Sequence, residues 1–218
     1  MRTARYFFFS VALLCVFSIC TSKPQNLILL CAGDSITESS YPRHLQRLFE
    51  AEGIRAKVYN FGRSGNTTGE YLEFLKQNEA DLKELQPDFI LLQLGTNDVR
   101  MDHDRTTGDA FYINMKSILS LFRPFTNREG KKSRILLALI PPVPHDLPYP
   151  FSSESCTRVY EEINPIITKI AVEEKMTLVD NYSLFIRSPR LLAGIHPTEE
   201  GYKKLARNWY DSLLSDMK

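Results

Sequence analysis

Short apolar runs alternate with longer segments of helical spacing along most of the chain. Five of these runs are short, apolar and bounded by glycine, proline or polar turns, which predicts β-strands. They lie at residues 27–32, 56–61, 88–94, 134–140 and 177–179. The first and third runs, LILLCA and DFILLQL, are almost continuously apolar. This pattern indicates strands that are buried on both faces.

Between these runs, apolar residues recur every three or four positions, which predicts amphipathic helices. The predicted helices cover residues 41–52, 71–85, 110–122, 159–175 and 198–214. Pro165 should kink the fourth helix or mark its true start, because proline cannot donate the helical hydrogen bond. In the last helix we expect an apolar stripe that packs on the core, formed by Tyr202, Leu205, Trp209 and Leu213.

Alternating strands and helices predict a parallel sheet with helices on both faces. We therefore expect an α/β fold, a three-layer α/β/α flavodoxin-like sandwich with a five-stranded parallel sheet. In such folds ligands bind at the carboxyl ends of the strands. The least regular stretch, PPVPHDLPYPFSSESC at 141–156, follows the fourth strand and is a candidate wall of a substrate pocket.

Polar residues follow the strands where a ligand would bind. Gly33-Asp34-Ser35 follows the first strand, residues 62–67 (GRSGNT) the second and residues 95–98 (GTND) the third, while His196 comes after the fifth. In a parallel sheet all four segments open onto one edge. Each alone has a structural explanation as a turn or a helix cap, and a lone histidine before a proline is more often structural.

Together these residues suit acyl transfer. A serine needs an adjacent base to remove its proton, and attack on an ester creates an oxyanion that needs hydrogen-bond donors. Ser35 as nucleophile, His196 as base, and the Gly65 N–H and Asn97 amide as oxyanion donors make one coherent set.

The segments AGDSIT, NFGRSGNTT, LLQLGTND and GIHPTEEGY resemble the four sequence blocks of the SGNH (GDSL) hydrolase family, in the family's order. The resemblance implies a flavodoxin-like fold and a serine esterase. The net charge and the absence of nucleotide-loop motifs argue against a cofactor. The resemblance also implies the same roles for Ser35, Gly65, Asn97 and His196, with Ser35 also donating its backbone N–H. Asp34 and Asp98 match the motifs and would order their loops.

The resemblance breaks at one position. Family members usually carry an aspartate three residues before the histidine, where this chain has Ala193. An orienting acid fixes the imidazole tautomer; in serine proteases its change to asparagine lowers kcat about 10⁴-fold. The candidate substitutes are Asp180, Glu199 and Glu200, although each has an alternative explanation as a helix-capping or first-turn acid. A backbone carbonyl could instead set the tautomer and leave a dyad.

The N-terminus has the layout of a secretory signal peptide. Arg2 and Arg5 precede an apolar run over 6–20, which is shorter than a membrane span needs, and polar residues follow. We predict a signal peptide at 1–22 and a hydrolase domain at 23–218, with a secreted or periplasmic location. The alternative is an uncleaved membrane anchor. A disulfide between Cys31 and Cys156 is left open.

The composition excludes some partners. The formal net charge is +1, which argues against a nucleic-acid partner, and no histidine–cysteine cluster has metal-ligand spacing. We interpret Asp102-His103-Asp104 as a solvated loop, and the glycosylation sequons at Asn66 and Asn181 as chance matches.

The leading hypothesis is an exported serine esterase that acts through an acyl-enzyme, with an acetylated carbohydrate as the favoured substrate. A lysophospholipid or another acyl ester is the alternative within this class. A weakly active or inactive homologue that binds glycans or acyl groups is the alternative of another class, motivated by Ala193.

Overall fold

The computed structural model describes residues 26–217, and the predicted signal peptide lies outside them. Its middle layer is a five-stranded parallel sheet with the order β2-β1-β3-β4-β5, which confirms the predicted flavodoxin-like topology. The strands are β1 (Leu27–Gly33), β2 (Ala56–Gly62), β3 (Phe89–Gln93), β4 (Arg134–Ala138) and β5 (Thr177–Val179).

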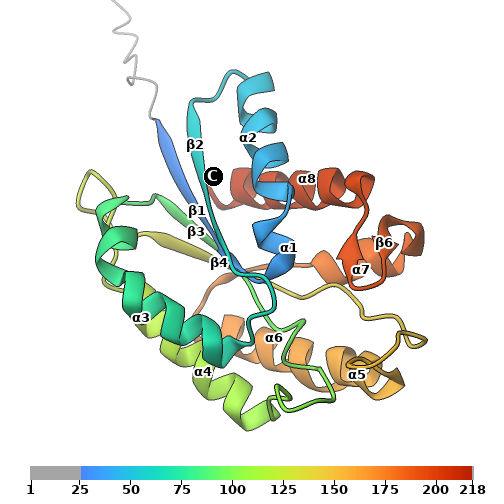
Figure 1. The fold of residues 1–218 in the computed structure, drawn as a ribbon. Helices are drawn as coiled ribbons and strands as arrows, with labels where there is room; N and C mark the ends of the chain where they lie inside the picture. The colour runs from blue at the N-terminus through green and yellow to red at the C-terminus, as the bar shows by residue number, and fades with distance from the viewer. Residues whose placement is uncertain (1–25, 218) are drawn as a thin grey trace, which may run out of the picture.

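Helices cover both faces of the sheet (Figure 1). One face carries α1 (Ser35–Glu38), α2 (Tyr41–Ala51) and α8 (Glu199–Asp216). The other carries α3 (Thr68–Glu84), α4 (Gly108–Phe122) and α6 (Asn164–Glu173). The sheet is therefore buried from both sides, as its apolar strands predict.

Alternate residues of the central strands supply the two cores. In β1, Leu30 points into the core beneath α3, α4 and α6, while Leu29 points into the core beneath α2 and α8. Trp209 of α8 is fully buried in the second core, and its ring stacks on Tyr41 with centroids 6.3 Å apart. The predicted core stripe of the last helix is confirmed, with exposed fractions of at most 7% at Tyr202, Leu205, Trp209 and Leu213.

Two helices differ from the expected ranges. Helix α3 begins at Thr68 rather than residue 71, because Thr67 and Glu70 form a reciprocal capping box. The expected helix over 159–175 consists of a π-helical turn η1 (Val159–Ile163) followed by α6, and an additional short helix, α5 (Ser153–Arg158), precedes it directly. Pro165 is the second residue of α6 and directly follows the π-helical turn, so its missing N–H interrupts the helical hydrogen bonds where the helix changes type.

The chain after β5 forms elements that the sequence pattern does not reveal. Helix α7 (Asn181–Ile186) and a 3₁₀ turn η2 (Pro189–Leu191) lead into a two-stranded hairpin, β6 (Leu192–Ala193) and β7 (His196–Pro197). The hairpin turn has Gly194 at φ +64°, as a turn with glycine in the first central position requires. His196 thus lies in a short strand rather than in the expected loop.

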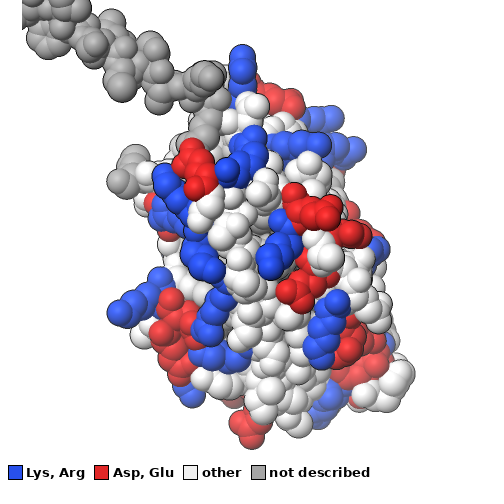
Figure 2. Space-filling view, turned by 90° about the vertical axis from the view of Figure 1, so that its left-hand side faces the viewer, with Lys and Arg blue, Asp and Glu red and all other residues white. Residues whose placement is uncertain are grey.

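The molecular surface carries charges of both signs. On the face shown in Figure 2, Lys and Arg side chains are interspersed with Asp and Glu. Among the helices of residues 26–217, none combines the length and the apolar character that a membrane span needs.

The approach of β2 to α1 depends on Gly62. A Cβ atom there would lie 2.0 Å from the Glu38 backbone nitrogen, so a larger residue must push the strand and helix apart. We predict that Gly62→Ala lowers the free energy of unfolding by about 1–3 kcal/mol, measured by urea denaturation. Gly69→Ala is the matched control, since its nearest neighbour would be at an ordinary 3.4 Å; equal stability of the two variants would contradict the prediction.

Candidate functional site

Ser35 begins α1 just beyond the carboxyl end of strand β1. Asp34 caps this helix, and its Oδ1 accepts the Ile36 N–H at 3.0 Å. The turn is tight, because a Cβ on Gly33 would lie 2.3 Å from the Gln93 carbonyl oxygen. As the first helical residue, Ser35 has a backbone N–H without an intrahelical acceptor. The serine hydroxyl and this N–H are both presented at the strand edge.

His196 lies opposite Ser35, although 161 positions separate them in sequence. The Ser35 Oγ and His196 Nε2 are 2.8 Å apart, a hydrogen-bonding distance. The hairpin that carries His196 is closed at its open end, where the Thr198 N–H donates to the Leu191 carbonyl at 2.8 Å. The Thr198 side chain also caps α8, which ties the hairpin to that helix. Partial burial lowers the pKa of His196 below its ordinary 6.5, so the ring is neutral near pH 7.

The three candidate orienting acids contact other groups. Asp180 caps α7, with its Oδ1 accepting the Ser183 N–H at 2.8 Å. Glu199 Oε1 is 3.0 Å from His44 Nε2, and Glu200 Oε2 is 3.9 Å from Lys203 Nζ. Within residues 26–217, no carboxylate hydrogen-bonds to His196. Serine and histidine therefore meet as a pair, without an acid in contact with the imidazole.

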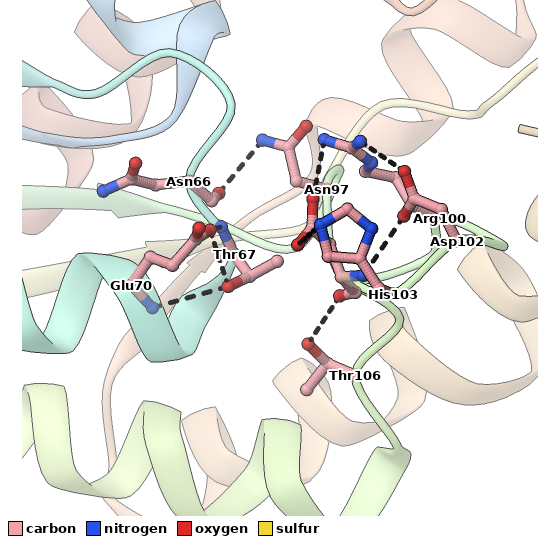
Figure 3. Close-up of polar contacts among 9 residues, drawn as sticks. Asn66, Thr67, Glu70, Asn97, Arg100, Asp102, His103 and Thr106 are labelled. Atoms are coloured by element: carbon pink, nitrogen blue, oxygen red, sulfur yellow. Dashed lines mark hydrogen bonds and ion pairs between the residues drawn. The ribbon is translucent and has the colours of Figure 1, made fainter. Parts of the chain in front are cut away.

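The other predicted residues, Gly65 and Asn97, lie in adjoining loops. Gly65 is in the turn between β2 and α3, at φ +81°. The Asn97 Nδ2 donates to the carbonyl of Asn66, the residue that follows Gly65, at 3.0 Å (Figure 3). This bond uses one amide hydrogen of Asn97 and leaves the second for another acceptor. The two loops that carry the predicted oxyanion donors are thus joined.

Two buried aspartates organise these loops. Asp98 accepts hydrogen bonds from the Thr68 N–H at 3.1 Å and the Thr68 hydroxyl at 2.6 Å, which ties the β3 loop to the start of α3. Burial raises the pKa of Asp98 and raises the pKa of Asp34 to about 7. Asp34 and Asp98 thus each accept a backbone N–H at the start of a helix, from Ile36 of α1 and Thr68 of α3.

An open depression surrounds the Ser35–His196 pair. Its lining consists mostly of polar side chains, from Ser35, Glu38, Ser39, Ser64, His196 and Tyr202. Sequence reasoning did not assign Glu38 to the site. The available signal was its spacing, because a residue three positions after Ser35 returns to the same side of the helix.

Other sequence features lie apart from this pair. Arg100 ion-pairs with Asp102 and, at 3.2 Å, with Asp104, so a guanidinium occupies the carboxylates that flank His103 (Figure 3). Cys31 and Cys156 are free thiols. Asn181 is fully buried and donates to Gln93 Oε1 at 2.6 Å, so its sequon is closed to modification in the folded protein.

Known proteins are similar to this chain in sequence. An acetylxylan esterase of Xylanibacter ruminicola is 26% identical over 214 residues, 87% of this chain and 43% of that protein. A multidomain esterase of Ruminococcus flavefaciens is 28% identical over 140 residues, 63% of this chain and 17% of that protein. The chain thus spans less than half the length of either relative.

The fold is shared with a GDSL-like lipase from Bacteroides thetaiotaomicron, with a TM-score of 0.68, 21% identity, and coverage of 88% of this chain and 89% of that one. The family model of the GDSL-like lipase/acylhydrolases matches residues 31–204, which include Ser35, Gly65, Asn97 and His196. The chain belongs to the GDSL-like lipase/acylhydrolase family.

Proposed function

We propose that the protein is a carboxylic ester hydrolase that acts through an acyl-enzyme on Ser35. The observation that carries this proposal is the 2.8 Å contact between Ser35 Oγ and His196 Nε2. A hydroxyl beside a neutral imidazole has a partner for its proton, which is the requirement for a serine nucleophile. The same contact argues against the alternative of an inactive binding homologue.

The proposed reaction has two halves. Ser35 Oγ attacks the ester carbonyl while His196 Nε2 takes the hydroxyl proton, and the imidazolium then gives that proton to the leaving alkoxide. Water, deprotonated by His196, next attacks the acyl-enzyme and releases the acid, and Ser35 regains its proton. Both halves need Nε2 free to accept, so Nδ1 must carry the ring proton.

The proposed oxyanion donors are the N–H groups of Ser35 and Gly65 and the side-chain amide of Asn97. Support comes from the helix start at Ser35, and from the Asn97–Asn66 bond that joins the other two loops. Donors fixed before the reaction stabilise the developing charge without reorganisation. No metal or organic cofactor has a step in this scheme.

We propose that the base works as a dyad with Ser35. Asp180, Glu199 and Glu200 are each engaged elsewhere, and burial is what shifts the pKa of His196. Without a carboxylate the imidazolium gains no ion pair in the transition state, so the reaction should be slower than with a complete triad.

An acetylated carbohydrate is the substrate class that we propose. The depression around Ser35 is open and lined mostly by polar side chains, which suits an ester of a polar alcohol better than a long apolar acyl chain. The 26% identity to an acetylxylan esterase points the same way. Such polymeric substrates lie outside cells, which agrees with the proposed signal peptide at 1–22 and catalytic domain at 23–218.

The nucleophile and the acyl preference can be tested together. We predict that wild-type protein hydrolyses p-nitrophenyl acetate and acetylated xylan, prefers acetate over octanoate, and labels with a fluorophosphonate. Ser35→Ala should lose labelling and lower kcat by at least about 10³-fold. Ser117→Ala on α4 is the control. A wild type that neither labels nor hydrolyses any ester would refute the proposal.

The missing acid gives a second prediction. Ala193 pairs with His196 across the hairpin, so side chains at these positions are cross-strand neighbours, roughly 5 Å apart at Cβ. An aspartate there would stabilise the imidazolium. We predict that Ala193→Asp raises kcat about tenfold or more and moves the acidic limb of the pH–rate profile about one unit higher.

The acidic limb of the pH–rate profile reports the pKa of His196, because only the neutral imidazole can act as the base. The wild-type rate should rise with pH through a pKa below 6.5 and then level off, because only the neutral ring accepts the serine proton. Ala193→Asn supplies a hydrogen-bond acceptor without charge and should leave the limb in place. An unchanged profile in Ala193→Asp would show that position 193 does not reach the imidazole.

A further inference from the structure

Glu38 lies at the reaction site without a part in the chemistry described above. It is the last residue of α1, the helix that Ser35 begins, and its side chain lines the same depression as Ser35 and His196. Glu38 is exposed, so its side chain does not contribute to the hydrophobic core.

The carboxylate of Glu38 binds the turn that carries a proposed oxyanion donor. Its Oε2 accepts the backbone N–H of Ser64 at 3.1 Å. Ser64 directly precedes Gly65, so this bond fixes the peptide next to the Gly65 N–H. Within residues 26–217, it is the only loop hydrogen bond made by the N–H of either Ser64 or Gly65.

The backbone of Glu38 is itself held firmly. Its N–H donates to the Asp34 carbonyl at 2.9 Å, and its carbonyl accepts the Asn60 Nδ2 at 2.9 Å. Gly62 allows the end of β2 to approach the Glu38 backbone closely. Glu38 is therefore a rigid point, fixed to both the serine helix and the strand before the Gly65 turn.

The turn that contains Ser64 and Gly65 has few other contacts that could fix its geometry. Its two ends are bonded to neighbouring loops, where the Arg63 N–H donates to the Gly33 carbonyl at 2.8 Å and the Asn66 carbonyl accepts the Asn97 amide. The ends are also bonded to each other, because the Asn66 N–H donates to the Arg63 carbonyl at a long 3.3 Å. Between these ends Ser64 and Gly65 are exposed, and Gly65 has no side chain to pack. Since glycine is the most permissive backbone residue, the direction of its N–H depends on its neighbours' bonds.

We propose that Glu38 is a positioning residue that aims the Gly65 N–H at the oxyanion by holding Ser64; this inference rests on the proposed function. The negative charge of Glu38 lies near a site where negative charge develops, which by itself opposes the reaction. Its benefit must come from the geometry of the hydrogen bond. Glutamine keeps an oxygen acceptor without the charge, and alanine removes both.

The test compares Glu38→Ala, Glu38→Gln and Glu73→Ala, the last an exposed glutamate on α3 paired with Lys76. We expect Glu38→Ala to lower kcat on p-nitrophenyl acetate about 10- to 100-fold with little change in KM, because the variant misaligns an oxyanion donor and leaves substrate binding intact. Glu38→Gln should recover kcat to within about threefold of wild type, as an intact acceptor requires.

Amide hydrogen exchange, read residue by residue by NMR, tests the tether without any catalysis. Exchange at Ser64 should quicken in Glu38→Ala and stay slow in Glu38→Gln and Glu73→Ala. A wild type without esterase activity but with this exchange pattern would refute the proposed function and retain the tether.

Three results would overturn the inference. Wild-type kcat in Glu38→Ala would show that the bond is dispensable. Equal losses of kcat in the alanine and glutamine variants would make charge, not bond geometry, the cause. A change in KM alone would mean that Glu38 binds the substrate instead.

Discussion

The parallel sheet, buried on both faces, is the constraint on which the rest of the structure depends. Since every strand runs the same way, the loops after β1, β2 and β3 must emerge at one edge. Two hydrophobic cores hold the helices against the sheet and so fix the loop ends. The serine and histidine are brought to 2.8 Å by elements that share no local sequence.

The loops at this edge are linked by hydrogen bonds that cross from one strand's end to the next. Asp98 ties the β3 loop to α3, Asn97 ties it to Asn66, and Glu38 ties the serine helix to Ser64. Buried or backbone-directed bonds of this kind hold a site in one geometry before a substrate arrives. The loops that carry the proposed oxyanion donors therefore have many supporting hydrogen bonds, whereas the histidine ring has few.

The scarcity of contacts to the histidine ring affects how the site can handle a proton. The imidazole is positioned by a hairpin and by partial burial, and burial alone favours its neutral form. A neutral ring is ready to accept a proton, yet the imidazolium that follows lacks a carboxylate partner. In the proposed reaction, the site is therefore better prepared for the first proton transfer than for stabilising the imidazolium that results, which a triad acid would stabilise.

The sequence by itself determined the layers, the strands and the residues at the strand ends. Short continuous apolar runs such as LILLCA, bounded by turn residues, are typical of strands covered on both faces, and four motifs in order marked Ser35, Gly65, Asn97 and His196. Only the tertiary structure decided which groups the candidate orienting acids contact. Asp180 and Glu199 are near His196 in sequence, but Asp180 caps α7 and Glu199 contacts His44. It also decided the hairpin at His196 and the reach of Glu38 to Ser64, because two-residue strands have no periodicity and a side-chain contact across 26 positions leaves no local pattern.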